Sequence, residues 1–172
     1  QPDRIKTLEE DVLRSFLRIE NNHHWSGLHR QVNRVCADMT ATRAALAELV
    51  NEARPITDRM QPVTNIKGMG KGIITAILHV AYPDKYGVWN NTSNDGLDDL
   101  GLLPRPPRGA SFGERYAAVN EVLVALAKEL DVDLWTLDTI WWYLGGDEDE
   151  EEVDHPATPS PETTTATLSP KT

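Results

Sequence analysis

The chain has 172 residues, 40% of them hydrophobic, which is enough for one core of ordinary size. No run approaches the roughly 18 apolar residues of a membrane span and no secretory signal precedes the polar opening, which argues against a membrane segment and indicates an intracellular protein of the cytoplasm or nucleoid. The net charge of −10 does not exclude nucleic acid, because eight acidic residues and one lysine fall in residues 147–172 and leave the rest of the chain near neutral.

Helical periodicity dominates the first half of the chain. Apolar residues recur at spacings of three and four over residues 8–19, which predicts one helix there. A polar connection, ENNHHWSG, leads to a second periodic stretch, which predicts one long helix over residues 28–53. Pro55 ends it, because the residue before a proline is pushed out of helical geometry. A shorter helical pattern, interrupted by Pro62, continues over residues 56–66.

An apolar segment then runs to Tyr82 and predicts a buried helix, which is followed by a loop over residues 83–93. The short pattern DGLDDLGLL predicts a helical turn over residues 95–103. Residues 104–112, PRPPRGASF, are expected to form a stiff basic loop, because three prolines prevent a regular element.

Two more helices are predicted over residues 113–130 and 134–144, with Asp133 as the N-cap of the second. No stretch shows the alternating pattern of a strand, so the sequence predicts an all-α domain over residues 1–146. Residues 147–172 are acidic and rich in Pro and Thr, with almost no large apolar residues, which predicts a disordered tail. Such a tail either keeps the protein soluble or competes with phosphates for a basic face.

Three glycines and a lysine precede the apolar helix in the stretch NIKGMGKGIITAIL. Gly68 and Gly70 permit the backbone angles of a very short reversal, so we expect a helix on each side, the second beginning at about Lys71. Met69, between the two glycines, is expected to fill the core. The pattern predicts a helix-hairpin-helix over about residues 56–82, and an ordinary glycine turn between two packed helices is the alternative.

The start of the second helix in this pattern is a candidate phosphate site. Its unpaired amides, the positive end of the helix dipole and the Lys71 ammonium converge on one small volume. A side chain at a glycine position would keep a phosphate away from the backbone. A nucleotide-binding glycine loop does not fit, because it needs a preceding strand and a βαβ frame.

The segment IKGMGKGIITAILHVAYPDKYGVWN resembles the helix-hairpin-helix core of the DNA base-excision glycosylase superfamily, over roughly residues 55–100. The resemblance implies a glycosylase-like helical domain whose hairpin clasps the phosphate backbone of duplex DNA. The hairpin residues that would bind DNA are Lys67, Gly68, Met69, Gly70, Lys71 and Gly72. The resemblance also implies a monovalent cation, held by the backbone carbonyls of Thr64, Ile66 and Met69, and no other cofactor.

Two positions depart from the pattern of that family. Its catalytic aspartate lies shortly beyond the second hairpin helix, where this chain has Asn90, and its bifunctional members carry a lysine nucleophile where this chain has Gly72. An amide cannot act as a base and, lacking negative charge, stabilises an oxocarbenium ion poorly. Glycine cannot form a Schiff base, and Lys71 would point about 100° away from the required direction. The resemblance therefore implies the scaffold and the phosphate grip without the glycosylase reaction.

Three functions stay open on this reading. The first is a non-enzymatic DNA-binding domain. The second is a glycosylase-like enzyme that acts on a modified base with a displaced acid, for which Asp95, five residues after Asn90, is the nearest candidate. Asp98 and Asp99 are better explained as a solvated helix start. The third is a protein-interaction domain on the same scaffold.

Several aromatic and basic residues are further candidates for contact with DNA. Trp89, beside Asn90, either meets DNA or packs in the core. Arg105 and Arg108 on the proline-rich loop either contact phosphates or are simply solvated. In the last helix the shared face of residues 134, 137, 141 and 144 places Trp141 in the core. Trp135, Trp142 or Tyr143 is then left to stack on a base.

A metal site is the weakest of the candidates. The ligands that it could use are His23, His24, His29 and Cys36. Their spacing fits no structural zinc pattern, and a wet loop is the expected home of the two adjacent histidines. Cys36 is the only cysteine, which excludes both a disulfide framework and an iron–sulfur cluster and indicates a reducing compartment. The chain begins with Gln1 rather than Met, which is consistent with a piece of a longer protein that carries a further domain.

Overall fold

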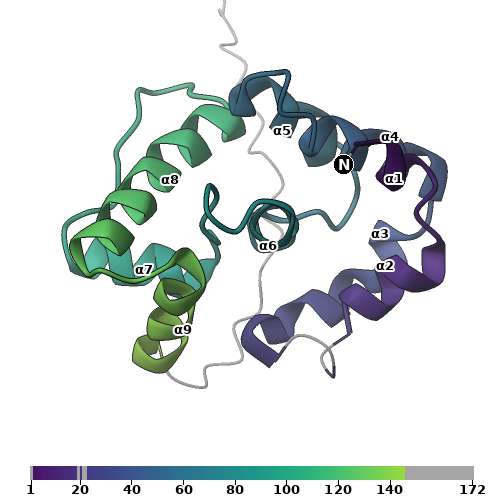
Figure 1. Ribbon diagram of the computed structural model, residues 1–172. Coiled ribbons are helices and arrows are strands. Elements are labelled where there is room, and N and C mark those ends of the chain that lie inside the picture. The colour runs from purple at the N-terminus through teal and green to yellow at the C-terminus, as the bar shows by residue number, and fades with distance from the viewer. Residues whose placement is uncertain (1, 19, 21–22, 146–172) are drawn as a thin grey trace, which may run out of the picture.

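The computed structural model describes residues 2–18, 20 and 23–145 (Figure 1). Every regular element within this part of the chain is a helix, so the predicted all-α class is confirmed for it. In chain order the elements are α1 (Pro2–Lys6), α2 (Glu10–Phe16), the 3-10 helix η2 (His23–Gln31), α3 (Val32–Val35), α4 (Met39–Leu49), α5 (Ile56–Thr64), α6 (Lys71–Ala81), α7 (Asn91–Asp99), α8 (Phe112–Glu129) and α9 (Leu134–Gly145). The predicted disordered tail, residues 147–172, lies outside the described residues.

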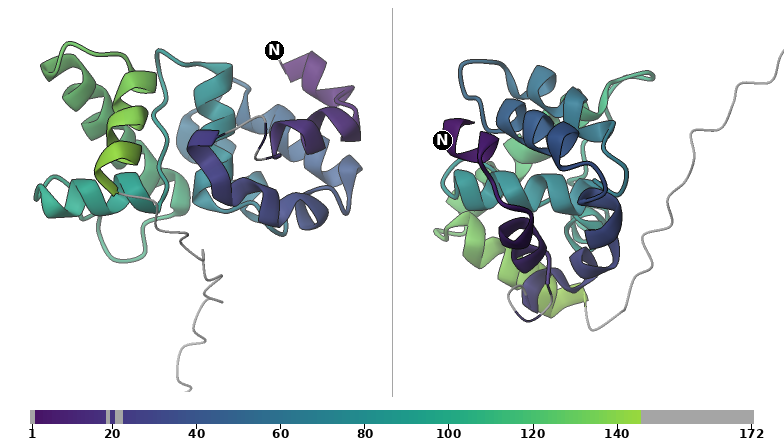
Figure 2. Two further views of the ribbon diagram at one scale, coloured as in Figure 1. Left: turned by 90° about the horizontal axis from the view of Figure 1, so that it is seen from below. Right: turned by 90° about the vertical axis from the view of Figure 1, so that its right-hand side faces the viewer.

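Helix α6 occupies the centre of the molecule and is seen almost end-on in Figure 1. Helices α1 to α4 lie on one side of it and α7 to α9 on the other, which the view from below makes clear (Figure 2). Helix α5 packs against both α4 and α8 and so connects the two sides. The sequence of α6 is apolar except for Lys71, Thr75 and His79, and this apolar character suits a helix enclosed by others. Its buried residues are Gly72, Ile73, Ile74, Thr75, Ala76, Leu78 and His79.

The prediction of one helix over residues 28–53 is wrong, because the chain turns between α3 and α4. The Asp38 side chain accepts the amide of Ala41 at 3.0 Å and caps a new helix there. The Thr42 hydroxyl donates to the carbonyl oxygen of Val35 at 2.8 Å across the turn. Apolar residues keep a helical spacing through this turn, so their periodicity alone does not reveal the break.

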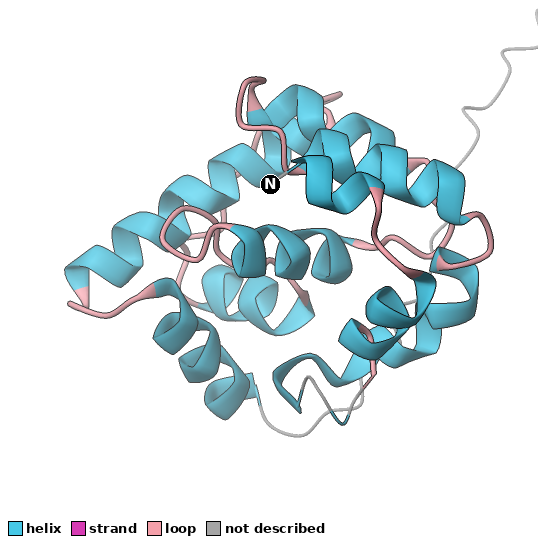
Figure 3. Cartoon of the chain, turned by 45° about the vertical axis from the view of Figure 1, so that its right-hand side comes forward, coloured by secondary structure: helices cyan, strands magenta, loops and turns pink. Residues whose placement is uncertain are grey.

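Helix ends elsewhere follow the capping residues, and loops join the helices throughout the described part (Figure 3). Asp133 accepts the amide of Thr136 at 2.6 Å at the start of α9, as predicted. The predicted loop over residues 83–93 ends earlier than expected, because α7 already begins at Asn91. Helix α1 was not predicted. No helix in the described residues combines the length and the apolar character that crossing a bilayer would need.

Candidate functional site

The turn between α5 and α6, residues 65–70, has the tight geometry that the glycine pattern predicts. Gly68 has a φ of +87°, in the left-handed region that favours glycine. The amide of Met69 donates to the carbonyl of Ile66 at 3.0 Å, and the amide of Gly70 donates to the carbonyl of Gly68 at 3.1 Å. Met69 is 6% exposed and fills the core, as expected. We call these six residues the α5–α6 turn.

One side of the α5–α6 turn packs against the chain itself. A Cβ on Gly68 would lie 2.9 Å from Cβ of Arg34 and 3.2 Å from Oε1 of Gln31. The absence of a side chain at Gly68 is therefore explained by the turn and by this close contact, and not by a ligand. The contact also brings the exposed Arg34 side chain beside the turn. No local sequence pattern indicated this cation, because it depends on how α3 packs against the turn.

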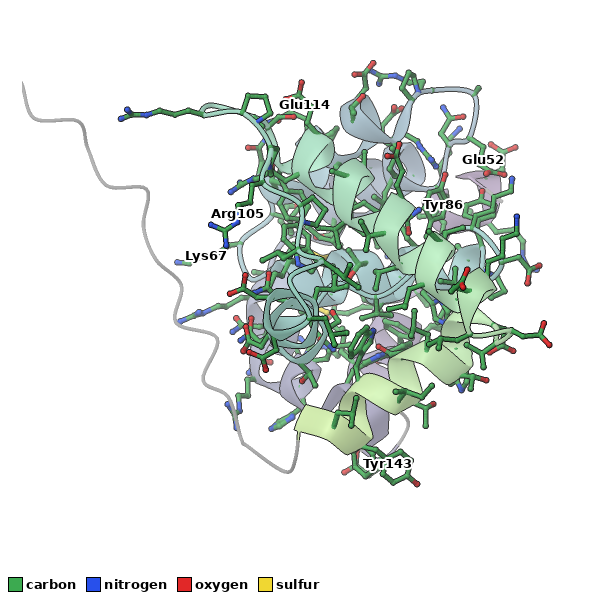
Figure 4. All side chains as sticks on the ribbon, turned by 90° about the vertical axis from the view of Figure 1, so that its left-hand side faces the viewer. Glu52, Lys67, Tyr86, Arg105, Glu114 and Tyr143 are labelled. Carbon is green, nitrogen blue, oxygen red and sulfur yellow. The ribbon has the colours of Figure 1, made fainter. Side chains whose placement is uncertain are left out.

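Helix α6 begins directly after the turn, and its N-terminus carries unpaired amides. Its N-cap, Gly70, has no side chain to accept the first amides of the helix, which keep the partial positive charge of a helix N-terminus. Lys67 is exposed, and the half-buried Lys71 places its ammonium 5.5 Å from the centre of the Trp89 ring. Figure 4 shows Lys67 and Arg105 on the same side of the molecule. The turn thus gathers positive charge from side chains and backbone.

The N-terminus of α7 lies next to that of α6. Asn90 caps α7 with a capping box: its Oδ1 accepts the amide of Ser93 at 2.9 Å, and its own amide donates to the Ser93 hydroxyl at 3.0 Å. A Cβ on Gly72 would lie 3.6 Å from Cβ of Asn90. The fold therefore brings together the two positions that the resemblance marks as replaced. It also gives Asn90 a structural task, as a cap, which explains an amide there without any reaction.

Trp89 belongs to the core, which is the alternative to DNA contact named above. Its ring is 9% exposed and stacks on Phe112 and Tyr116, with ring centres 5.8 and 6.4 Å away. Its Nε1 donates to Oδ1 of Asn94 at 3.1 Å. A ring enclosed in this way has no free face for a base, so Trp89 contributes to the site only by supporting Lys71.

The candidate acids lie on the solvated face of α7, and Asp98 and Asp99 are at the end of this helix, not at its start as predicted. Asp95 is exposed and accepts the Asn94 side-chain amide at 3.1 Å. Asp98 is exposed and lies 3.6 Å from a guanidinium nitrogen of Arg105, whose side chain is 88% exposed. Such an exposed pair contributes little to stability and is easily exchanged for another anion. Arg108 is exposed on the same proline-rich loop.

Two sets of expected ligands remain: the backbone carbonyls implied for a monovalent cation and the side chains considered for a metal site. Of the three carbonyls implied for a monovalent cation, those of Thr64, Ile66 and Met69, the Ile66 oxygen already accepts an amide in the turn and keeps one lone pair. His29 is exposed and Cys36 is buried, while the side chains of His23 and His24 lie outside the described residues. In the described part of the chain no group of three or more His, Cys, Asp or Glu side chains could hold a metal.

We expect alanine to be tolerated at Gly72 and to be harmful at Gly68. The methyl of Gly72→Ala meets Asn90 at an ordinary contact distance, so the free energy of unfolding should change by less than about 0.5 kcal/mol. Gly68→Ala combines a positive φ with a 2.9 Å overlap and should lower it by about 1–3 kcal/mol. Urea unfolding of the two variants measures the difference. Equal unfolding midpoints would contradict this account of the turn.

Comparisons of the chain with protein-family models, with curated proteins and with solved structures found no match. The chemistry of the site therefore has to be argued from its own residues. These residues combine backbone amides, a turn and exposed cations.

Proposed function

We propose that this chain is a non-enzymatic DNA-binding domain that grips the phosphate backbone of duplex DNA with the α5–α6 turn acting as a helix-hairpin-helix. One observation carries the proposal: the uncapped N-terminus of α6 lies between Lys67 and Lys71 at a tight turn. Helix N-termini bind phosphate because their amides point at the ligand and their dipole favours negative charge. The neighbouring N-terminus of α7 adds the positive end of a second helix dipole.

Cations around the turn support a backbone grip that is independent of sequence. Arg34 lies beside Gly68, and Arg105 is on the same side of the molecule as Lys67 (Figure 4). The pairing of Arg105 with Asp98 is exposed, so a phosphate can replace the carboxylate. Contacts of this kind fix the position of a protein on DNA without reading bases.

The same geometry supports a domain without glycosylase chemistry. Gly72 and Asn90 lie next to each other, and neither side chain can act as the nucleophile or the acid of that reaction. Asp95, the displaced acid of the enzymatic alternative, faces solvent from α7. Incubation with duplexes that carry modified bases should therefore release no base and leave no abasic sites. Release of a base would favour the enzyme instead.

Salt-dependent DNA binding tests the proposal directly. With the full chain and a labelled duplex, Lys71→Gln should weaken binding to unrelated sequences alike. It should also reduce the slope of log K against log salt concentration by about 0.9, the value for one lost phosphate contact. Lys85→Gln is the matched control, because Lys85 pairs with Glu52 at 2.7 Å, and Glu52 lies on the opposite side from Lys67 (Figure 4).

Two results would overturn the proposal. One is the absence of any duplex binding at low salt, and the other is equal binding by Lys71→Gln and Lys85→Gln. Thermal unfolding of each variant should accompany the titration, since Lys71 also contacts Trp89. Indifference to DNA would favour a protein-interaction domain, for which the exposed Trp142, Tyr143 and Leu144 at the end of α9 offer an apolar surface.

A further inference from the structure

Four side chains from three elements form a cluster at the other end of α6, away from the α5–α6 turn. They are Trp25 of η2, His79 of α6, and Trp135 and Asp138 of α9; we call them the His79 cluster. The rings of His79 and Trp135 are stacked, with centres 5.3 Å apart and planes 20° apart. Trp25 meets both rings edge-on, at 6.3 Å from His79 and 5.7 Å from Trp135. Three aromatic rings and one carboxyl group therefore lie together.

His79 holds an acceptor that the described residues leave unused. Its side chain is fully buried, and Nδ1 lies 2.8 Å from the carbonyl oxygen of Tyr86. A carbonyl only accepts, so Nδ1 must carry the proton and Nε2 the lone pair. Burial lowers the pKa of His79, so the ring is neutral at physiological pH. Among the described residues Nε2 has no hydrogen-bond partner, and leaving a buried acceptor unsatisfied is unfavourable.

Asp138 is a second acceptor with spare capacity. It is 8% exposed, and its Oδ2 accepts the Nε1–H of Trp25 at 2.9 Å. Burial raises the pKa of Asp138 to about 6, so near neutral pH most molecules carry a carboxylate there. A carboxylate has about four acceptor positions, and the Trp25 N–H fills one. The cluster is therefore rich in acceptors and poor in donors.

Trp135 is the member of the cluster that meets solvent. It is 45% exposed, and its ring lies flat over the otherwise enclosed imidazole. Trp135 and Asp138 are three residues apart on α9, which makes them neighbours on one helix face. A ring that took the place of the Trp135 side chain would thus stack on His79 with Asp138 beside it.

We propose that the His79 cluster is a second binding site, which takes a planar heteroaromatic ring with amino N–H donors in place of the Trp135 ring. Such a ring is that of cytosine or adenine, presented either by a free nucleoside or by an unpaired base in a single strand. Its face stacks on the imidazole, and its amino group donates to the Asp138 carboxylate. In a uracil ring the single N–H donor lies between two carbonyl oxygens, and these oxygens would face the Asp138 carboxylate. Uridine should therefore bind at least about tenfold more weakly than cytidine.

The test uses the full chain and four probes: cytidine, adenosine, uridine and short single-stranded oligonucleotides. The 15N resonances of the His79 ring should shift saturably with cytidine and adenosine, because a different ring then stacks on the imidazole. Binding by nucleosides would identify a free small molecule as the source of the ring, and binding by oligonucleotides alone would identify a strand. A resonance that stays unchanged with all probes up to millimolar concentration would overturn the proposal.

Variants of α9 sharpen this test. Asp138→Asn introduces a donor at constant volume, so it should lose at least about tenfold in cytidine affinity and lose the preference over uridine. Trp135→Ala should bind cytidine at least as tightly as the wild type, because the displaced ring is gone, and Trp142→Ala should match the wild type. Retained preference in Asp138→Asn, or loss of binding in Trp135→Ala, would refute the site.

The inference rests on the proposed function only for the idea that DNA supplies the ring. The two can fail separately, because the His79 probes do not require Lys71. Lys71→Gln should therefore lose duplex affinity while its His79 resonance still responds to cytidine. A loss of both responses in this variant would show that the two sites are not separate.

Discussion

Gly113→Ala should lower the free energy of unfolding by about 3 kcal/mol, because the new methyl group would overlap the backbone of α5. A Cβ on Gly113 would lie 2.3 Å from the carbonyl oxygen of Thr57 and 2.7 Å from its Cα. Both are main-chain atoms of a helix, which cannot rotate away as a side chain can. The two helices must then separate, and overpacking of this kind is among the larger effects of a single substitution.

Gly72→Ala is the matched control for this prediction. Gly72 and Gly113 are each the second residue of a helix, so helix propensity changes alike in the two variants. They differ in the space for a methyl group, which is 3.6 Å from its nearest neighbour at Gly72. Urea unfolding should show a large shift of the midpoint for Gly113→Ala alone. Equal stability of the two variants would mean that α5 and α8 are not in close contact.

Local patterns in the sequence were sufficient for helices α5, α6, α8 and α9 and for the α5–α6 turn. The glycines at 68 and 70, with Met69 between them, indicated both the reversal and the buried plug, because backbone angles and one apolar side chain decide them. The apolar run after Lys71 indicated the central helix. The starts of two helices were not predicted because their N-cap residues were not identified. Asp38 caps α4 inside an unbroken apolar pattern, and Asn90 caps α7.

The parts of the site that depend on distant contacts could not be predicted. Arg34 reaches the turn only because α3 packs beside it. Trp89 is enclosed by Phe112 and Tyr116, which belong to α8 and are separated from Trp89 in the sequence by α7 and the loop that follows it. The bond between Trp25 and Asp138 spans 113 residues of sequence. No periodicity or spacing carries such pairings, since they arise when separate helices meet.

Arg59→Ala should destabilise the protein by about 4 kcal/mol, because Arg59 joins three segments of the core. The side chain is 2% exposed, and its Nη1 donates to the carbonyl oxygen of Leu49 at 3.0 Å. Its Nη2 donates to the hydroxyl of Tyr86, whose ring centre lies 5.3 Å from the guanidinium carbon. Leu49 is the last residue of α4, where unpaired carbonyls and the helix dipole favour a cation. Alanine would leave both acceptors buried and open a cavity.

Arg59→Met separates these two losses. Methionine fills most of the volume and removes a buried charge, which has no carboxylate partner among the described residues, but it leaves the same two oxygens unsatisfied. We therefore expect a loss of about 2 kcal/mol, half that of alanine, by urea unfolding. Equal losses would assign the whole effect to hydrogen bonds. Figure 4 shows Tyr86 well apart from Lys67 and Arg105. Folded Arg59→Met should therefore bind duplex DNA as the wild type does, which distinguishes a weakened core from a damaged site.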